Sequence, residues 1–230
     1  KLGWNIDPAT WEAAKAPAIV EELAQKVSKE RIGEELVKTM QGKNIRYAMS
    51  LLKDSGLLQR FITDAVAGTE YDGQLAPFDM SQNNAHHELG LSDHTIQVMG
   101  HFVSQHPEDS PEKRATKAFA ALGHDFGKMV KSIHDVKPNG ETSYHGHEDH
   151  SPAILEAFLR HVRLHSFAPI AAGLAKMHMR PYSLYGASDK SLRRFLRDAA
   201  QTGVEWIDIL NHVVADVQSK SEKPHLDPEV

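Results

Sequence analysis

Cysteine is absent from this 230-residue sequence. Its absence excludes disulfide bonds, thiolate catalysis and cysteine-ligated zinc sites, and it fits a cytoplasmic protein because the cytosol keeps thiols reduced. The sequence also lacks a run of about eighteen apolar residues, the length that a transmembrane helix needs. No secretory signal is visible at the beginning of the chain. We therefore expect no membrane partner.

An excess of positive charge is also lacking, since the formal net charge is -5. The whole protein should therefore not attract nucleic acid, and any such contact must come from a local basic patch. With 40% apolar and 25% charged residues, the composition is ordinary for a globular protein with a sizeable core. The chain begins with Lys1 rather than methionine, so we expect it to be a piece of a longer protein.

The alternation of apolar and polar residues that indicates β-strands does not occur, and apolar residues recur instead at helical spacing. We predict an all-α fold, a helical bundle. In residues 1–66, Asp7, Ser28 and Asn44 each precede a helical pattern and are suitable N-caps. This first region is predicted to be a small helical domain.

Residues 67–85 are rich in Gly, Asp, Asn and Pro and are predicted to be a loop or linker. A second helical domain is expected at 86–220 and a polar tail at 221–230. Within this domain, Ser92, Ser151 and Ser188 are predicted to begin helices, and two more are expected at 111–122 and 169–179. The last helix is predicted to turn these residues inward: Ile207, Leu210, Val213, Val214 and Val217.

Histidine is abundant, with fifteen residues scattered along the chain. His124 and Asp125 follow the apolar residues 118–122, place a nitrogen and an oxygen donor side by side, and can bind a divalent metal with positions left for water. Gly127 is expected to loosen the chain there, and Lys128 to reach an anion on the metal. About one such His–Asp pair is expected by chance, and the second pair, His134 and Asp135, lies in a polar loop and is interpreted as solvated.

The first pair gains weight from further donors near predicted helix ends. His94 lies at a helix start, His147 before a helix and His178 at a helix end, while Asp216 belongs to the last helix. Ends of different helices can meet in one cleft, so these side chains could share an ion. Nitrogen and oxygen donors permit Mn, Ni, Mg, Fe, Co or Zn.

The order of these donors resembles that of the HD superfamily of metal-dependent phosphohydrolases, which are all-helical. The resemblance is carried by LSDHT at 91–95, LGHDFGK at 122–128 and YHGHE at 144–148. It implies a first metal on His94, His124, Asp125 and Asp216, and a second that Asp125 bridges to His147 and His178. It also implies phosphate contacts from Lys128 and Arg180, and supporting or proton-donating roles for His87 and His145.

A closer resemblance, to bacterial tRNA nucleotidyltransferases (CCA-adding enzymes), covers nearly the whole chain. LGWNIDPAT at 2–10 and VSKERIGEEL at 27–36 are similar to the start and helix of their neck region. MHMRP at 177–181, DKSLRRF at 189–195 and ADVQSK at 215–220 are similar to their HD-bearing body. The nucleotidyltransferase head is absent, so this chain alone is not expected to transfer nucleotides.

Two functions are open at this point. The first is a metal-dependent hydrolase of 2′-nucleotides, 2′,3′-cyclic phosphates or small phosphoesters. The alternative is a tRNA-binding or dimerising body with a vestigial metal site. In that alternative the basic helix at 190–197 would follow RNA phosphates through Arg193, Arg194 and Arg197, although a merely solvated charged face fits the same pattern. The apolar side of this helix, Leu192, Phe195 and Leu196, is expected to face inward. Retention of all six metal donors favours the hydrolase, and the oligomeric state is left open.

Overall fold

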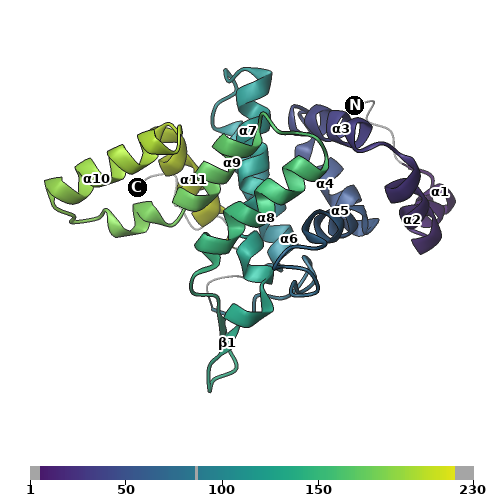
Figure 1. The fold of residues 1–230 in the computed structure, drawn as a ribbon, viewed down its shortest axis with the longest axis horizontal. Coiled ribbons are helices and arrows are strands. Elements are labelled where there is room, and N and C mark those ends of the chain that lie inside the picture. The colour runs from purple at the N-terminus through teal and green to yellow at the C-terminus, as the bar shows by residue number, and fades with distance from the viewer. Residues whose placement is uncertain (1–5, 86–87, 221–230) are drawn as a thin grey trace.

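The computed structural model describes residues 6–85 and 88–220. The described residues form eleven α-helices and only two short strands, which confirms the all-α prediction (Figure 1). The helices are α1 Pro8–Ala14, α2 Pro17–Lys26, α3 Lys29–Met40, α4 Ile45–Asp54, α5 Leu57–Val66, α6 Leu91–Ser104, α7 Pro111–Gly123, α8 His147–His161, α9 Ala168–Met177, α10 Asp189–Gln201 and α11 Trp206–Gln218. Three short 3-10 helices connect them: η1 Phe126–Met129, η2 Lys131–Ile133 and η3 Arg180–Ser183.

Side-chain caps begin several of these helices. Asp7, Ser28 and Ser188 each accept a hydrogen bond from the backbone N–H three residues ahead, as predicted. Ser110 does the same at the start of α7. Each cap satisfies one of the N–H groups that a helix start leaves without an intrahelical partner.

Two helices begin at positions other than those predicted. Gly90, not Ser92, is the N-cap of α6, and Ser92 is buried inside the helix. The helix predicted from Ser151 begins four residues earlier, at His147, because Gly146 adopts φ 85° and turns the chain into α8. The earlier start makes His147 the first residue of a helix.

A single hydrophobic core runs through the described part of the chain, from Ala24 in α2 to Ala215 in α11. Helices α6 to α9 pack on one another at its centre, while α4 contacts α6 and α5 contacts α8 (Figure 1). The segment 67–85, predicted as a linker, also packs on this core. Phe78 lies edge-to-face on Phe126 at 5.4 Å, and the N–H of Ala76 donates to the carbonyl of Met129 at 2.7 Å. The boundaries proposed at 66 and 86 stay a prediction.

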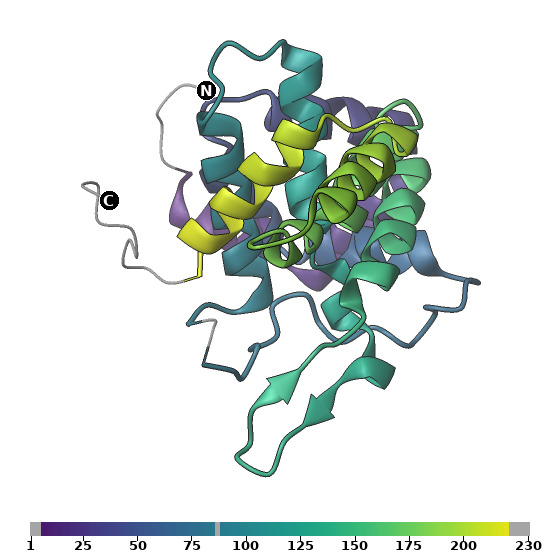
Figure 2. The same cartoon turned by 90° about the vertical axis from the view of Figure 1, so that its left-hand side faces the viewer.

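A small hairpin interrupts the helical pattern between η2 and α8. Strands β1 Asp135–Val136 and β2 Thr142–Ser143 pair antiparallel and extend away from the bundle (Figure 2). Asp135 is exposed in β1, as expected of a solvated pair, but His134 Nε2 lies 2.8 Å from the Lys128 carbonyl oxygen. Strands of two residues are too short to show an alternating pattern in the sequence.

The predicted inward faces of the last two helices are partly wrong. In α11, Ile207 and Val214 are 39% and 43% exposed, whereas Asp208, His212 and Asp216 are buried. Their spacing of four residues places these three polar side chains on one face. That face is turned inward by its contacts in the bundle: Asp208 pairs with Lys117, His212 packs on Phe102, and Asp216 pairs with His94. In α10 only Phe195 of the predicted apolar face is buried, and Leu192 and Leu196 are 39% and 45% exposed.

Candidate metal centre

The six predicted metal ligands lie together where several helix ends meet. His94 belongs to the first turn of α6, His124 directly follows α7, His147 begins α8 and His178 directly follows α9. Asp125 follows His124, and Asp216 lies in the last turn of α11. All six side chains are buried. The six residues lie up to 122 positions apart in the sequence, so the packing of α6, α7, α8, α9 and α11 brings them together.

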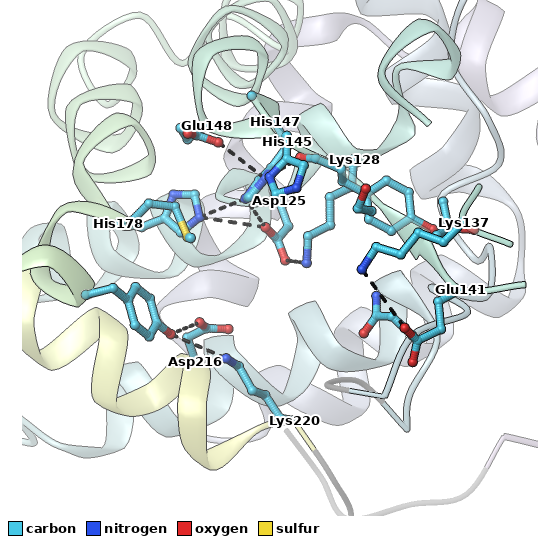
Figure 3. Close-up of a pocket in the computed structure, with 17 residues that line it drawn as sticks. Asp125, Lys128, Lys137, Glu141, His145, His147, Glu148, His178, Asp216 and Lys220 are labelled. Carbon is cyan, nitrogen blue, oxygen red and sulfur yellow. Dashed lines mark hydrogen bonds and ion pairs between the residues drawn. The ribbon is translucent and has the colours of Figure 1, made fainter. Parts of the chain in front are cut away.

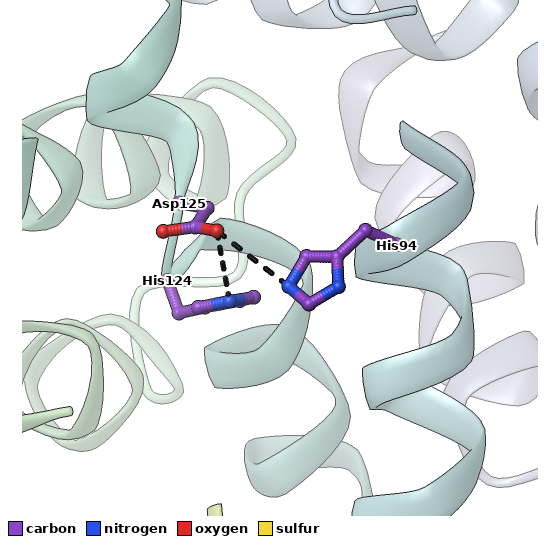
Figure 4. Close-up of side chains that lie close together, drawn as sticks. All are labelled: His94, His124 and Asp125. Carbon is purple, nitrogen blue, oxygen red and sulfur yellow. Dashed lines mark ion pairs between the residues drawn. The ribbon is translucent and has the colours of Figure 1, made fainter. Parts of the chain in front are cut away.

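One side of the Asp125 carboxylate faces two histidines. Oδ2 of Asp125 lies 3.3 Å from Nε2 of His124 and 3.7 Å from Nε2 of His94 (Figure 4). Oδ1 of Asp216 approaches the same two nitrogens, at 2.9 Å from His94 and 3.8 Å from His124. These four side chains can therefore surround a single ion.

The other oxygen of Asp125 faces the second pair of histidines. Oδ1 lies 3.1 Å from Nε2 of His147 and 3.7 Å from Nε2 of His178, and the two nitrogens are 3.2 Å apart (Figure 3). Asp125, His147 and His178 thus form a second group that could bind an ion. The single carboxylate lies between the two groups.

Each of the four histidines turns Nε2 inward because Nδ1 is bound elsewhere. The acceptors are backbone carbonyl oxygens, of Ser219 for His94 at 3.0 Å, Ala121 for His124 at 2.8 Å, Tyr144 for His147 at 2.9 Å and Ala175 for His178 at 2.5 Å. A carbonyl only accepts, so Nδ1 carries a proton in each ring, and Nε2 is the atom that presents a lone pair when the ring is neutral. Such a backbone contact is typical of metal-binding histidines.

Burial and neighbouring charges decide the protonation of the site. Burial lowers the pKa of His178 to about 3, and the charge on His124 acts in the same direction. Burial alone would also lower the pKa of His124, but the carboxylates of Asp125 and Asp216 outweigh it and raise that pKa to about 10. Burial would raise the pKa of Asp125, yet His124 and Lys128 hold it well below its usual range.

This electrostatic balance favours a bound cation. Two carboxylates stay ionised in a buried site, and in the metal-free protein a proton on His124 offsets part of their charge. A divalent cation would provide the same compensation and release that proton. Within the described part of the chain, Nε2 of His124 and Oδ1 of Asp125 are buried without a hydrogen-bond partner. Buried polar atoms normally have one, and a metal ion would satisfy both.

Gly127 brings the chain after Asp125 close to α8. A Cβ atom at this position would lie 2.0 Å from the carbonyl oxygen of His147. The N–H of Gly127 donates to Oγ of Ser151 at 2.9 Å. The glycine is thus needed for a close approach of two backbones, rather than for the loosening of the chain that the sequence suggested.

An open cavity of about 430 Å³ leads from solvent to the site, and Lys128 lies at its base. Nζ of Lys128 is 2.8 Å from Oδ2 of Asp125 and 2.9 Å from Oε1 of Gln82. His145 is exposed and lines the same cavity beside His147 (Figure 3). A molecule in this cavity can therefore touch both Lys128 and the exposed edge of the candidate ion sites.

The predicted arginines lie apart from this cavity. Arg180, in η3, pairs with Asp198 of α10 at 3.1 Å. Arg193 and Arg194 are exposed on α10, and none of the three is among the described residues that line the cavity. His87, predicted to support the ligands, falls outside the described residues.

Several residues at the site were not singled out by the sequence. The hydroxyl of Tyr182 donates to Oδ2 of Asp216 at 2.8 Å, and burial together with that carboxylate raises the pKa of Tyr182, so the phenol stays protonated. His212 is fully buried, with its ring centroid 4.9 Å from that of His124. Lys137 and Lys220 line the cavity. Lys220 ends the ADVQSK stretch at 215–220 but was not expected at the site, and the other three residues belong to no recognised motif. The packing of α11, η3 and the hairpin brings them here.

Comparison with known proteins bears on the N-terminal part of the chain. Residues 3–66 match a family described as the probable RNA and SrmB-binding site of polymerase A. The match supports a tRNA nucleotidyltransferase-like neck in this segment. No curated protein matches the chain. Among the helices of the described residues, none has the length and apolar character required to span a membrane.

Proposed function

We propose that the protein is a metal-dependent phosphoester hydrolase. The observation that carries this proposal is the position of Asp125, whose two carboxylate oxygens each face a pair of inward-turned histidine Nε2 atoms at the base of an open cavity. Nitrogen and oxygen donors with no cysteine suit borderline and hard divalent cations such as Mn, Ni, Mg, Fe, Co or Zn. The geometry supports one or two cations, with Asp125 shared between them.

The residues divide into those that hold the metal and those that meet the substrate. His94, His124, Asp125 and Asp216 would hold one cation, and Asp125 with His147 and His178 a second. Bound there, a divalent cation supplies a nucleophile derived from water at neutral pH and neutralises charge on the phosphoryl oxygens.

Lys128 and His145 would act on the substrate side of the site. Lys128, with its ammonium group at the base of the cavity, would orient a phosphoryl oxygen through a charge-assisted hydrogen bond. His145, exposed on the cavity wall, would donate a proton to the departing oxygen. The resemblance to the HD-bearing body of CCA-adding enzymes directs the substrate class to 2′-nucleotides, 2′,3′-cyclic phosphates and small phosphoesters.

Metal analysis combined with a phosphoester panel tests this proposal. The purified protein should retain a divalent metal by mass spectrometry and hydrolyse at least one of 2′-AMP, 2′,3′-cyclic AMP and p-nitrophenyl phosphate when that metal is supplied. Asp125→Ala should lose metal and at least about a hundredfold in rate. Asp135→Ala, in the exposed second His–Asp pair, is the matched control and should keep both. Equal activity of the two variants would overturn the proposal.

RNA binding is a second candidate function, favoured by the family match at residues 3–66 and by the basic face of α10. Arg193, Arg194 and Arg197 are exposed there, with Asp198 at 3.8 Å and 3.5 Å from the last two. Substitution of Arg193 and Arg194 by Glu should weaken tRNA binding and reduce its salt dependence. Unchanged binding would remove α10 from this role. If the chain serves only as an RNA-binding body, Asp125→Ala should leave tRNA binding intact.

A further inference from the structure

Among the described residues, three lysines from different elements line the cavity. Lys128 belongs to η1, Lys137 follows β1 in the hairpin, and Lys220 follows α11. Their side chains enter the cavity from three directions (Figure 3). Lys128 pairs with Asp125 of the candidate metal centre. The positions of Lys137 and Lys220 are not explained by that centre.

Lys220 is held on the Asp216 side of the cavity. Its Nζ lies 3.5 Å from the Tyr182 hydroxyl and 5.3 Å from the centroid of the Tyr182 ring. The same hydroxyl donates to Asp216, so Tyr182 connects Lys220 to the candidate metal centre. A cation over an aromatic face is stabilised but keeps hydrogen-bond donors for a ligand.

Lys137 approaches from the opposite wall. The hairpin that carries it is closed by a hydrogen bond from the Lys137 N–H to the Glu141 carbonyl oxygen at 2.8 Å. The Lys137 ammonium lies 4.0 Å from the Glu141 carboxylate, and the Lys137 side chain is 49% exposed. Such an exposed pair contributes little free energy, so Lys137 can turn to an anionic ligand at small cost.

The charge of the cavity explains why these lysines matter. Four carboxylates line it, those of Asp125, Asp216, Glu141 and Glu148, against the three ammonium groups. One or two divalent cations would make the inner end positive, and among the described residues Lys137 and Lys220 supply the positive charge at the mouth. A cavity of about 430 Å³ is large enough for a mononucleotide, which would extend from the metal centre to the mouth.

We propose that Lys137 and Lys220 bind a second anionic group of the substrate, so that the site prefers a nucleotide with a further phosphate over one with only the reacting phosphate. This inference rests on the proposed function for the position of the reacting group. The reacting phosphoryl group lies by Asp125 and Lys128, and the second phosphate lies between the two lysines of the mouth. The substrate class is then a nucleoside bisphosphate or the phosphorylated end of an oligonucleotide.

Direct binding measurements test this assignment independently of turnover. The probes are adenosine 2′-phosphorothioate and its 5′-phosphorylated derivative, which differ by one phosphate and hydrolyse slowly. Calorimetry on the metal-loaded full chain should give a dissociation constant about tenfold lower for the 5′-phosphorylated probe, the effect of roughly one charged hydrogen bond. In Lys137→Met/Lys220→Met the preference should fall below about threefold. Lys43 is exposed between α3 and α4, and Lys43→Met removes the same kind of charge at a distant position. This control variant should keep the preference for the 5′-phosphorylated probe.

The outcomes separate this inference from the proposed function. Equal affinity of the wild type for the two probes, a preference that survives in the double variant, or no binding of either probe would overturn it. Hydrolysis of 2′-AMP in those cases would leave the hydrolase proposal standing. Conversely, a lysine-dependent preference without any hydrolysis would support the anion site and count against the hydrolase. Circular dichroism and thermal melting establish that the surface variants are folded.

Discussion

Lys117 provides the sharpest test of how the candidate metal centre is supported. Its side chain is only 2% exposed, in the middle of α7, and its ammonium lies 2.6 Å from Asp109 and 3.0 Å from Asp208. Helix α7 ends at Gly123, directly before His124 and Asp125, whereas Asp208 belongs to α11, which carries Asp216. The ionic contact therefore joins α11, which carries Asp216, to the helix directly before Asp125.

Lys117→Met keeps most of the volume of the side chain but removes its charge. Loss of one partner from a buried ion pair costs about 3–5 kcal/mol, because the other charge is left uncompensated. Lys113 lies 3.4 Å from Asp208 and would retain part of the compensation. We therefore expect a loss near the lower limit, about 3 kcal/mol. For a chain of this size that loss lowers Tm by roughly 6–12 °C.

Denaturant unfolding and a double-mutant cycle measure this effect. Lys113→Met is the matched control on the same helix, and since its side chain is 36% exposed it should lose less than about 1 kcal/mol. Lys117→Met/Asp208→Asn should lose less than the sum of the single changes. A free-energy cost of Lys117→Met no larger than that of Lys113→Met would refute the role given to this buried ion pair. Metal affinity, measured alongside, should fall in Lys117→Met because α11 is no longer held in place near Asp216.

Three further predictions concern the surroundings of the site. Tyr182→Phe should keep the fold but weaken metal affinity about 10–100-fold in a calorimetric titration, because Asp216 loses the hydroxyl that orients it; unchanged affinity would contradict this role. Gly127→Ala should destabilise the protein by more than about 2 kcal/mol in denaturant unfolding and lower its metal content, since the new Cβ would meet the His147 carbonyl; a neutral effect would show that the two backbones can separate. His212→Phe should be neutral or stabilising by up to about 1 kcal/mol in thermal melting, because within the described residues neither ring nitrogen has a hydrogen-bond partner; a large loss would reveal a polar role for this ring.

Helix starts that depend on local contacts were predicted correctly, and features that depend on distant contacts were not. Helix starts at Asp7, Ser28 and Ser188 could be predicted because capping is a contact between residues three positions apart. The start of α8 at His147 was not predicted. It depends on the positive φ of Gly146, and a glycine in a loop can adopt that conformation without beginning a helix. The inward face of α11 was wrong because hydrophobicity suggested Val214, while buried ionic partners turned Asp208 and Asp216 inward.

The candidate site shows the same division. Six metal donors could be selected in advance, because the type of each donor and the order of the motifs can be read from the sequence. The structure brings all six together: His94, His124, Asp125, His147, His178 and Asp216. The arginines could not be placed in the same way. Arg180 pairs with Asp198, and Arg193 and Arg194 face solvent on α10, because the direction of a surface side chain depends on the orientation of its helix.

The amino-acid sequence alone predicts that this protein is helical, that it has no cysteine chemistry, and which nitrogen and oxygen donors it can offer to a metal. These properties follow from local spacing, from composition and from the chemistry of each side chain. Helix packing, in contrast, is what places one carboxylate, Asp125, between two histidine pairs and brings Tyr182, Lys137 and Lys220 to the cavity around them. The reason is that such contacts join residues far apart in the chain, and their distances depend on how the helices pack.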